Sequence, residues 1–283
     1  MRWLAFILLL AVGCGPEKRP PPQPSTLPAK AVHIHLPGIG GYRSIDRMFL
    51  QGLNQGGLDA EFHPYDWTKG DPGLGALLTT NMHTTEAKSV ADLVQQLARE
   101  NPHATLTVSV HSGGAGIIVW ALEQLPDDVK IDSLLLLSPA LSPQYDLSKA
   151  LRHVRGKVYA FYSPYDVAIL GIGTHMFGTI DGVKTDAAGK TGFAKPAGAD
   201  DAQYAKLVQV PYDSSWVRVG NIGDHIGTLS RPFARRVVAP LLRTGNLPQI
   251  TRESLRTPAT LPTGAPPTPP GATTTPAIPT AAQ

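Results

Sequence analysis

Short apolar segments alternate with amphipathic segments along the middle of the chain. The apolar segments have the length and the β-branched content of strands, and the amphipathic ones carry apolar residues at helical spacing. Near-continuous apolar strands that alternate with helices are typical of parallel strands covered on both faces. The pattern therefore predicts an α/β fold with a doubly wound, mostly parallel sheet. Strands are expected at 31–36, 58–65, 105–110, 131–137, 158–162 and 216–219, and helices at 42–53, 85–100, 114–125 and 232–242.

Both ends of the chain differ from this alternating core. Fourteen of the 27 prolines lie within 16–28 and 251–283, where a chain with few large apolar side chains cannot offset its ordering entropy. Within the core, the stretch 167–213 is rich in Gly, Asp and Ala and breaks the alternation. An excursion of that length is commonly functional. We expect a Pro-rich linker at 14–30, one domain at 31–246 with an irregular excursion near its site at 167–213, and a disordered Pro/Thr-rich tail at 247–283.

The first residues have the pattern of an export signal. An apolar run from Trp3 to Val12 would make about 15 Å of helix, half of what a bilayer core requires, so 1–13 is expected to be a signal peptide. The segment Ala11-Val12-Gly13-Cys14 resembles the lipobox of bacterial lipoproteins, with Ala11 where Leu is usual. This resemblance implies that Cys14 carries acyl chains, two or more of which anchor a protein stably.

The expectation from this signal is an exported lipoprotein, anchored in a membrane and facing the periplasm or the cell surface. An ordinary cleaved secretory signal with an incidental cysteine is the alternative.

Charge and cysteine content exclude several classes of protein. The 25 basic and 22 acidic residues give a formal net charge of +3, which comes from the two ends of the chain. Without a basic run, nucleic-acid binding has no electrostatic basis. A single cysteine excludes a disulfide within the chain and any Cys-based zinc or iron–sulfur site.

Two histidines on the first strand could serve as metal ligands. His33 and His35 form an H-x-H pattern, which places both imidazoles on one face of a strand. No further His/Asp cluster at ligand spacing accompanies them. We expect these side chains to fill polar pockets of the sheet near the site, and we expect neither a metal nor a cofactor.

The segment Thr105 to Gly116 carries the sharpest chemical signal. A β-branched strand runs into His111-Ser112-Gly113-Gly114 and directly into an apolar helix. This resembles the nucleophile elbow G-x-S-x-G of the α/β-hydrolase superfamily, with Val110 where the first glycine is expected. The resemblance implies that Ser112 is the nucleophile, although a serine that only caps the helix is the alternative reading. The core as a whole then resembles a small α/β-hydrolase that begins at the superfamily's third strand.

Members of this superfamily carry an acid and a histidine after later strands, in that order. Asp166 follows the expected strand 158–162, and His225 follows 216–219, at spacings of 54 and 59 residues. The resemblance implies that His225 is the general base and Asp166 its carboxylate. Asp146 is a rival acid, and His175 is a weaker rival base. Asp224 is expected to shape the turn beside His225.

The resemblance also implies an oxyanion hole. One donor would be the backbone N–H of Gly113, which follows the nucleophile, and the other would come from the loop Leu36 to Gly41. By position this second donor is Ile39, with Gly40 as the alternative. The loop lacks both the G-x-G-x-x-G and the P-loop spacing, which disfavours a nucleotide site.

The function implied by the resemblance is a serine hydrolase that cleaves a small-molecule or lipid carboxylic ester through an acyl-serine. Amide or peptide hydrolysis or acyl transfer on the same triad is the alternative within enzymes. A non-catalytic, membrane-anchored binding protein on a hydrolase scaffold is the alternative outside them.

Overall fold

The computed structural model describes residues 30–70, 74–166 and 179–256. Six strands form one parallel sheet in the order β2-β1-β3-β4-β5-β6. Their bounds are β1 Ala31–Leu36, β2 Ala60–Pro64, β3 Leu106–His111, β4 Ser133–Leu137, β5 Val158–Tyr162 and β6 Leu207–Pro211. The fold is α/β-hydrolase-like, as the sequence predicts.

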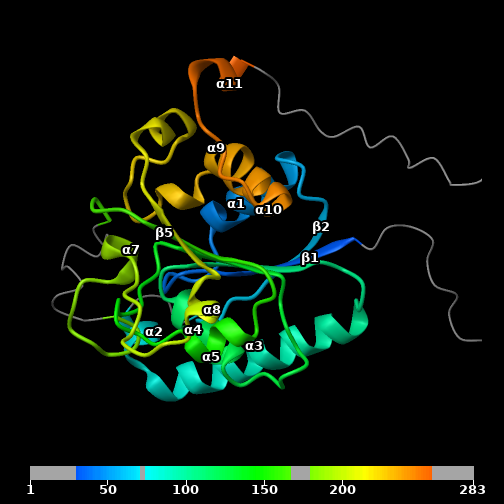
Figure 1. The fold of residues 1–283 in the computed structure, drawn as a ribbon, viewed down its shortest axis with the longest axis vertical. Coiled ribbons are helices and arrows are strands. Elements are labelled where there is room, and N and C mark those ends of the chain that lie inside the picture. The colour runs from blue at the N-terminus through cyan, green and yellow to red at the C-terminus, as the bar shows by residue number, and fades with distance from the viewer. Residues whose placement is uncertain (1–29, 71–73, 167–178, 257–283) are drawn as a thin grey trace, which may run out of the picture.

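Helices cover both faces of this sheet (Figure 1). One layer holds α1 Ser44–Gln55, the short helices η1 Ser214–Val219, η2 Gly227–Leu229 and α9 Arg231–Phe233, the π-helix η3 Ala234–Val238, and α10 Ala239–Thr244. The other holds α3 Thr80–Glu100, α4 Gly114–Leu122 and α5 Ser148–Arg152. Further short helices are α2 Leu74–Leu78, α7 Ala188–Thr191, α8 Asp201–Tyr204 and α11 Arg252–Arg256.

The core consists of two apolar clusters, one on each face of the sheet, because successive side chains of a strand point to opposite faces. On β4, for example, Leu134 and Leu136 belong to the cluster under α3 and α4, and Leu135 and Leu137 to the cluster under α1 and α9. Helix α4 is apolar all round and almost entirely buried, as expected of a central helix. The second cluster extends to Ile250, beyond residue 246, where we expected the domain to end.

The end of the chain departs from the predicted elements at one strand. The expected strand 216–219 is wrong: η1 is a helical turn there, because Asp213 caps it and Trp216 and Val219, three residues apart, both face the core. The sixth strand is β6, which lies inside the excursion 167–213 and pairs with β5. It is only five residues long and follows a Gly-, Asp- and Ala-rich stretch without periodicity, so the sequence pattern assigned no strand there.

The predicted helix 232–242 forms as α9, η3 and α10 in succession. Pro240 lacks the N–H needed for an α-helical bond at the start of α10, and a π-helical turn precedes it. Within the described ranges, no helix combines the length and the hydropathy that a membrane span requires. Cys14 and the expected signal peptide lie outside those ranges.

Candidate active site

Ser112 lies in the turn between β3 and α4. Its φ of 51° is in the left-handed region, which few non-glycine residues adopt. Neighbouring backbone fixes this conformation: the N–H of Ser112 donates to the carbonyl of Leu137, and its carbonyl accepts from the N–H groups of Ala115 and Ala140. A strained residue persists where its surroundings over-determine it, and such sites cluster at active centres.

The structure brings Ser112, His225 and Asp166 into hydrogen-bond contact. The Oγ of Ser112 lies 2.9 Å from Nε2 of His225, and Nδ1 of His225 lies 2.8 Å from Oδ1 of Asp166. Asp166 is 8% exposed, so its carboxylate meets the imidazole away from bulk water. Three residues more than 50 positions apart in sequence thus form one continuous chain of hydrogen bonds.

The chemistry of these atoms assigns the protons. A carboxylate can only accept a hydrogen bond, so the Nδ1–H of His225 donates to Asp166. In the neutral ring Nε2 is then the acceptor, and it receives the Ser112 hydroxyl. The arrangement can therefore take a proton from Ser112 while the carboxylate stabilises the imidazolium that forms.

The rival residues lie elsewhere. Asp146 is exposed, and its Oδ1 accepts from the Ser148 N–H and the Tyr204 hydroxyl. The backbone carbonyl of Asp224 accepts from Gly227, which agrees with a role in the turn after His225. His175 lies outside the described residues.

The loop between β1 and α1 lies directly against the elbow. A Cβ added to Gly113 would come within 2.8 Å of the side chain of Ile39, and one added to Gly114 within 2.7 Å of the Pro37 carbonyl oxygen. Glycine at both positions therefore lets the loop approach the start of α4. The N–H groups of Ile39 and Gly113 donate to no backbone carbonyl of the described residues. Gly40, the alternative donor, contributes its carbonyl to the Arg43 side chain.

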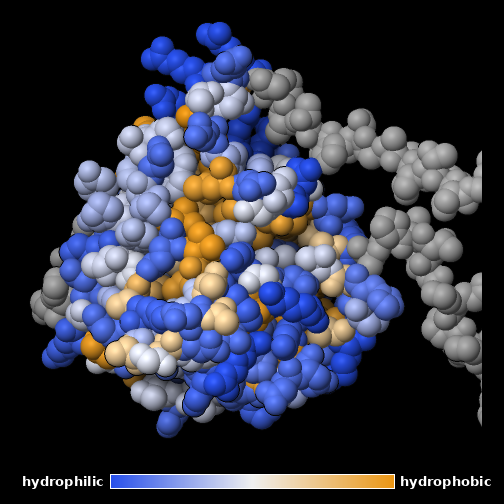
Figure 2. Space-filling model, in the orientation of Figure 1, coloured by the Kyte–Doolittle hydropathy of each residue, from blue (hydrophilic) through white to orange (hydrophobic). Residues whose placement is uncertain are grey.

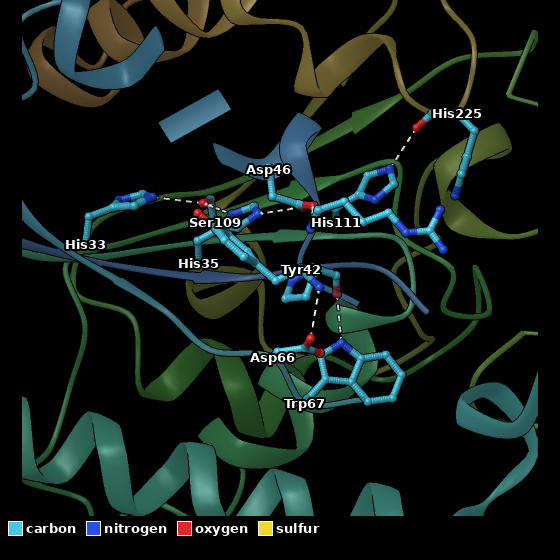
Figure 3. A network of polar contacts seen from close by, with 11 residues as sticks. His33, His35, Tyr42, Asp46, Asp66, Trp67, Ser109, His111 and His225 are labelled. Carbon is cyan, nitrogen blue, oxygen red and sulfur yellow. Dashed lines mark hydrogen bonds and ion pairs between the residues drawn. The ribbon is translucent and has the colours of Figure 1, made fainter. Parts of the chain in front are cut away.

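The segment after β2 holds this loop in place (Figure 3). The indole Nε1–H of Trp67 donates to the Pro37 carbonyl at 2.7 Å, and Trp67 is fully buried. Oδ2 of Asp66 accepts from the backbone N–H of Tyr42 at the other end of the loop. Because both partners come from a segment about 30 residues downstream, the sequence does not reveal them.

A buried polar network crosses β1 and β3 on the face that α1 covers (Figure 3). Nε2 of His35 donates to Oδ1 of Asp46, and its Nδ1 lies 2.8 Å from the Ser109 hydroxyl. The same hydroxyl lies 2.8 Å from Nε2 of His33, whose Nδ1 lies 2.7 Å from the Thr107 hydroxyl. Each ring nitrogen of the two buried histidines has a partner, so the prediction that both fill polar pockets of the sheet is confirmed.

Burial shapes the charges of this network. Burial, and then the neighbouring His35, lower the pKa of His33 to about 3, so its ring is neutral at pH 7. Burial raises the pKa of Asp46, but the hydrogen bond from His35 and the backbone N–H of Arg43 outweigh it and lower the pKa overall. Asp46 thus stays ionised and caps α1. Among the described residues no group of three or more His, Cys, Asp or Glu side chains could hold a metal ion.

His111, the residue before Ser112, contacts the loop that carries His225. Its Nε2–H donates to the backbone carbonyl of His225 at 2.8 Å, and the two rings lie 4.9 Å apart. Burial, and then the nearby His225, lower the pKa of His111 to about 4. A neutral ring therefore lies beside the ring of His225.

Val110 stands where the superfamily pattern has its first glycine, and the structure accommodates it. Its side chain is fully buried in the core cluster under α3 and α4. The tight crossing between loop and helix falls at Gly113 and Gly114 instead. Sequence reasoning did not single out His111 or Asp46, although a histidine next to Ser112 was a signal that could have pointed to His111.

Comparisons with known proteins bear on the fold. A scan against protein-family models and a search of curated proteins found no match. Among solved structures, lipase B from Aspergillus fumigatus has a TM-score of 0.50 and 13% identity, over 82% of this chain and 57% of that one. This chain thus spans little more than half the length of that lipase.

Two further structures are similar over more of their own length. A dienelactone hydrolase from Anabaena variabilis has a TM-score of 0.42 at 15% identity, over 76% of this chain and 84% of that one. An acetylxylan esterase has a TM-score of 0.40 at 15% identity, over 77% of this chain and all of that one. At such identities the likeness concerns the fold, and the chemistry is argued from the site.

Proposed function

We propose that this protein is a serine hydrolase that cleaves carboxylic esters through an acyl-serine intermediate. The observation that carries the proposal is the hydrogen-bonded chain from Ser112 through His225 to Asp166 at the carboxyl ends of the strands. Esters are the first class to test because they are intrinsically more reactive than amides. Acyl transfer to a second alcohol and amide hydrolysis would use the same three side chains.

In the first half of the proposed reaction, the Oγ of Ser112 attacks the ester carbonyl carbon. Nε2 of His225 takes the hydroxyl proton, and Asp166 stabilises the imidazolium. The N–H groups of Gly113 and Ile39 would donate to the negative oxygen of the tetrahedral intermediate. The intermediate then collapses, the C–O bond to the alcohol breaks, and His225 returns its proton to the departing alcohol.

In the second half, water repeats these steps on the acyl-serine. His225 takes a proton from the water as it attacks the acyl carbon, and the same two N–H groups hold the oxyanion. The bond to Ser112 Oγ breaks, the serine recovers its proton from His225, and a carboxylic acid leaves. The ester and water are the reactants of the two halves.

Labelling with a fluorophosphonate tests this proposal directly. The reagent phosphonylates a serine only where a base activates it, and an adduct on Ser112 is expected from the intact mass and a peptide map. Ser112→Ala should abolish both labelling and hydrolysis of a soluble p-nitrophenyl ester, whereas Ser142→Ala, a buried serine bonded to Asp181, should keep both. An adduct on another serine, or none on folded protein, contradicts the proposal and favours a binding protein on a hydrolase scaffold.

We also propose that the chain is exported and anchored at a membrane through lipidated Cys14. The support is the sequence pattern alone: a short apolar run that ends at the single cysteine, followed by a Pro-rich spacer. Such a spacer favours extended polyproline II conformations and would separate the domain from its anchor.

A further inference from the structure

The charges of this nearly neutral chain are distributed unevenly over its fold. Residues 214–256 contain seven arginines, no lysine and only two acidic residues, whereas the rest of the described chain has 18 acidic and 15 basic residues. The segment forms η1, η2, α9, η3, α10 and α11, which lie with α1 on one side of the sheet (Figure 1). Among the described residues the basic excess is thus concentrated in one helix layer.

Three exposed arginines of this layer have no direct ion pair among the described residues, although Arg218 interacts electrostatically with Asp213. Arg47 on α1, Arg218 on η1 and Arg231 on α9 are exposed, and none forms an ion pair with a described carboxylate. The elements that carry them are contiguous, since α1 packs against α9 and η3, and the Ser230 hydroxyl at the start of α9 donates to the Val219 carbonyl of η1. In Figure 2 hydrophilic side chains cover the end of the molecule where Figure 1 places α11, as they cover much of the rest of this view.

Large apolar side chains are exposed on the same layer. Val217 is 53% exposed, Ile222 is 58% exposed and Met48 is 41% exposed, and Val217 directly precedes Arg218. The first two lie on η1 and in the loop to His225. Exposed aliphatic side chains interspersed with arginines are not needed to bind a soluble polyanion. They are the combination that enters the headgroup region of an anionic bilayer.

We infer that this face, defined by Arg47, Met48, Val217, Arg218, Ile222 and Arg231, docks onto an anionic lipid bilayer. The arginines attract the negatively charged headgroups, and Val217 and Ile222 enter the boundary between headgroups and acyl chains. A second copy of the chain is disfavoured as the occupant because two such faces would repel each other. The inference does not depend on the proposed hydrolase, although Ile222 lies three residues from His225 and docking would bring the triad close to the lipid.

Vesicle co-sedimentation of the full chain tests the inference. The parent protein should bind vesicles that contain phosphatidylglycerol more tightly than pure phosphatidylcholine, and binding should weaken as salt is added. The triple variant Arg47→Gln, Arg218→Gln, Arg231→Gln should lose about 100-fold in partitioning, since each basic residue at an anionic surface contributes about fivefold. The matched variant Arg99→Gln, Lys149→Gln, Arg152→Gln removes the same charge from exposed positions on α3 and α5 and should bind like the parent.

A separate variant tests how much the exposed apolar side chains contribute to vesicle binding. The variant Val217→Ser, Ile222→Ser should weaken binding to the anionic vesicles with an unchanged salt dependence. All three variants share the N-terminal apolar run with the parent, so that run cannot cause a difference in binding among the four proteins. Equal loss in the two arginine variants, no preference for phosphatidylglycerol, or full retention of binding without Val217 and Ile222 would each overturn the inference. Hydrolysis of a soluble ester, measured on the same samples, reports separately on the proposed hydrolase.

Discussion

The imidazole of His111 contacts the backbone of the loop that carries His225, through the hydrogen bond from its Nε2 to the carbonyl oxygen of His225. The two residues are 114 positions apart, and His111 is the last residue of β3, next to Ser112. The ring of His225 is therefore positioned from two sides, by Asp166 at its Nδ1 and by His111 at its main chain.

Removal of the hydrogen bond between His111 and His225 should lower kcat more than it weakens substrate binding. His111→Leu is expected to reduce kcat by about tenfold, the value of one buried hydrogen bond, with little change in KM. His111→Gln can still donate to the carbonyl and should recover most of the activity. Steady-state kinetics on both variants, with circular dichroism as the check of folding, measure this. An equal loss in the two variants would mean that His111 acts through packing alone.

The second test concerns Asp166, the proposed acid of the triad. Asp166→Asn should lower kcat by up to about 10⁴-fold, because the amide cannot hold the imidazole in the required tautomer. Asp146→Asn is the matched control on the exposed surface and should stay within about tenfold of the parent. The opposite ranking in ester hydrolysis, with both proteins folded, would remove Asp166 from the triad.

The resemblance singled out Ser112, Asp166 and His225 because each follows an expected strand in the order of the superfamily, and the structure brings the three side chains together. The strand expected before His225 is wrong, since that segment is η1. The pairing of β6 with β5 depends on an edge position that no local pattern encodes. Short segments of this kind acquire their conformation from tertiary contacts.

The buried network illustrates a second limit. His33 and His35 were visible in sequence as a pair on one strand face, but their partners Ser109 and Asp46 come from β3 and α1. Which hydroxyl or carboxylate satisfies a buried imidazole depends on the register between strands. That register can be stated only once the sheet is assembled.

The close approach of loop and elbow predicts a distinctive glycine variant. Gly114→Ala places a Cβ 2.7 Å from the Pro37 carbonyl, so the loop that carries Ile39 must shift. We expect a loss of roughly 1–3 kcal/mol in the free energy of unfolding together with a lower kcat.

Gly156→Ala is the matched control. It places its Cβ 2.7 Å from the Asp132 carbonyl, at the opposite end of β5 from Asp166, and should lower stability without lowering kcat. Urea denaturation and ester kinetics separate the two; an unchanged kcat in Gly114→Ala contradicts the proposed oxyanion loop.

The anchoring proposal is tested at Cys14. Cys14→Ser should move the protein from the membrane fraction to the soluble or unprocessed fraction, because the acyl chains have no other attachment site of this kind. Fractionation in carbonate buffer, which strips proteins held only by charge, distinguishes the anchor from the basic face. If the variant fractionates like the parent under those conditions, Cys14 carries no lipid anchor.

The two depressed histidine pKa values predict how stability depends on pH. In the unfolded chain His33 and His111 titrate near 6.5, whereas in the folded protein their pKa values are about 3 and about 4. Between these limits the unfolded state binds more protons, so the free energy of unfolding falls as the pH is lowered from 7 toward 4, by up to about 1.4 kcal/mol per pH unit and group. Thermal unfolding from pH 7 to 4.5 should show this loss.

Variants test which histidine is responsible. His33→Gln should reduce the slope of stability against pH even where it lowers the overall stability. His103→Gln, an exposed control, should leave that slope unchanged. If the slope of His33→Gln equals that of the parent, His33 does not remain neutral in the folded state.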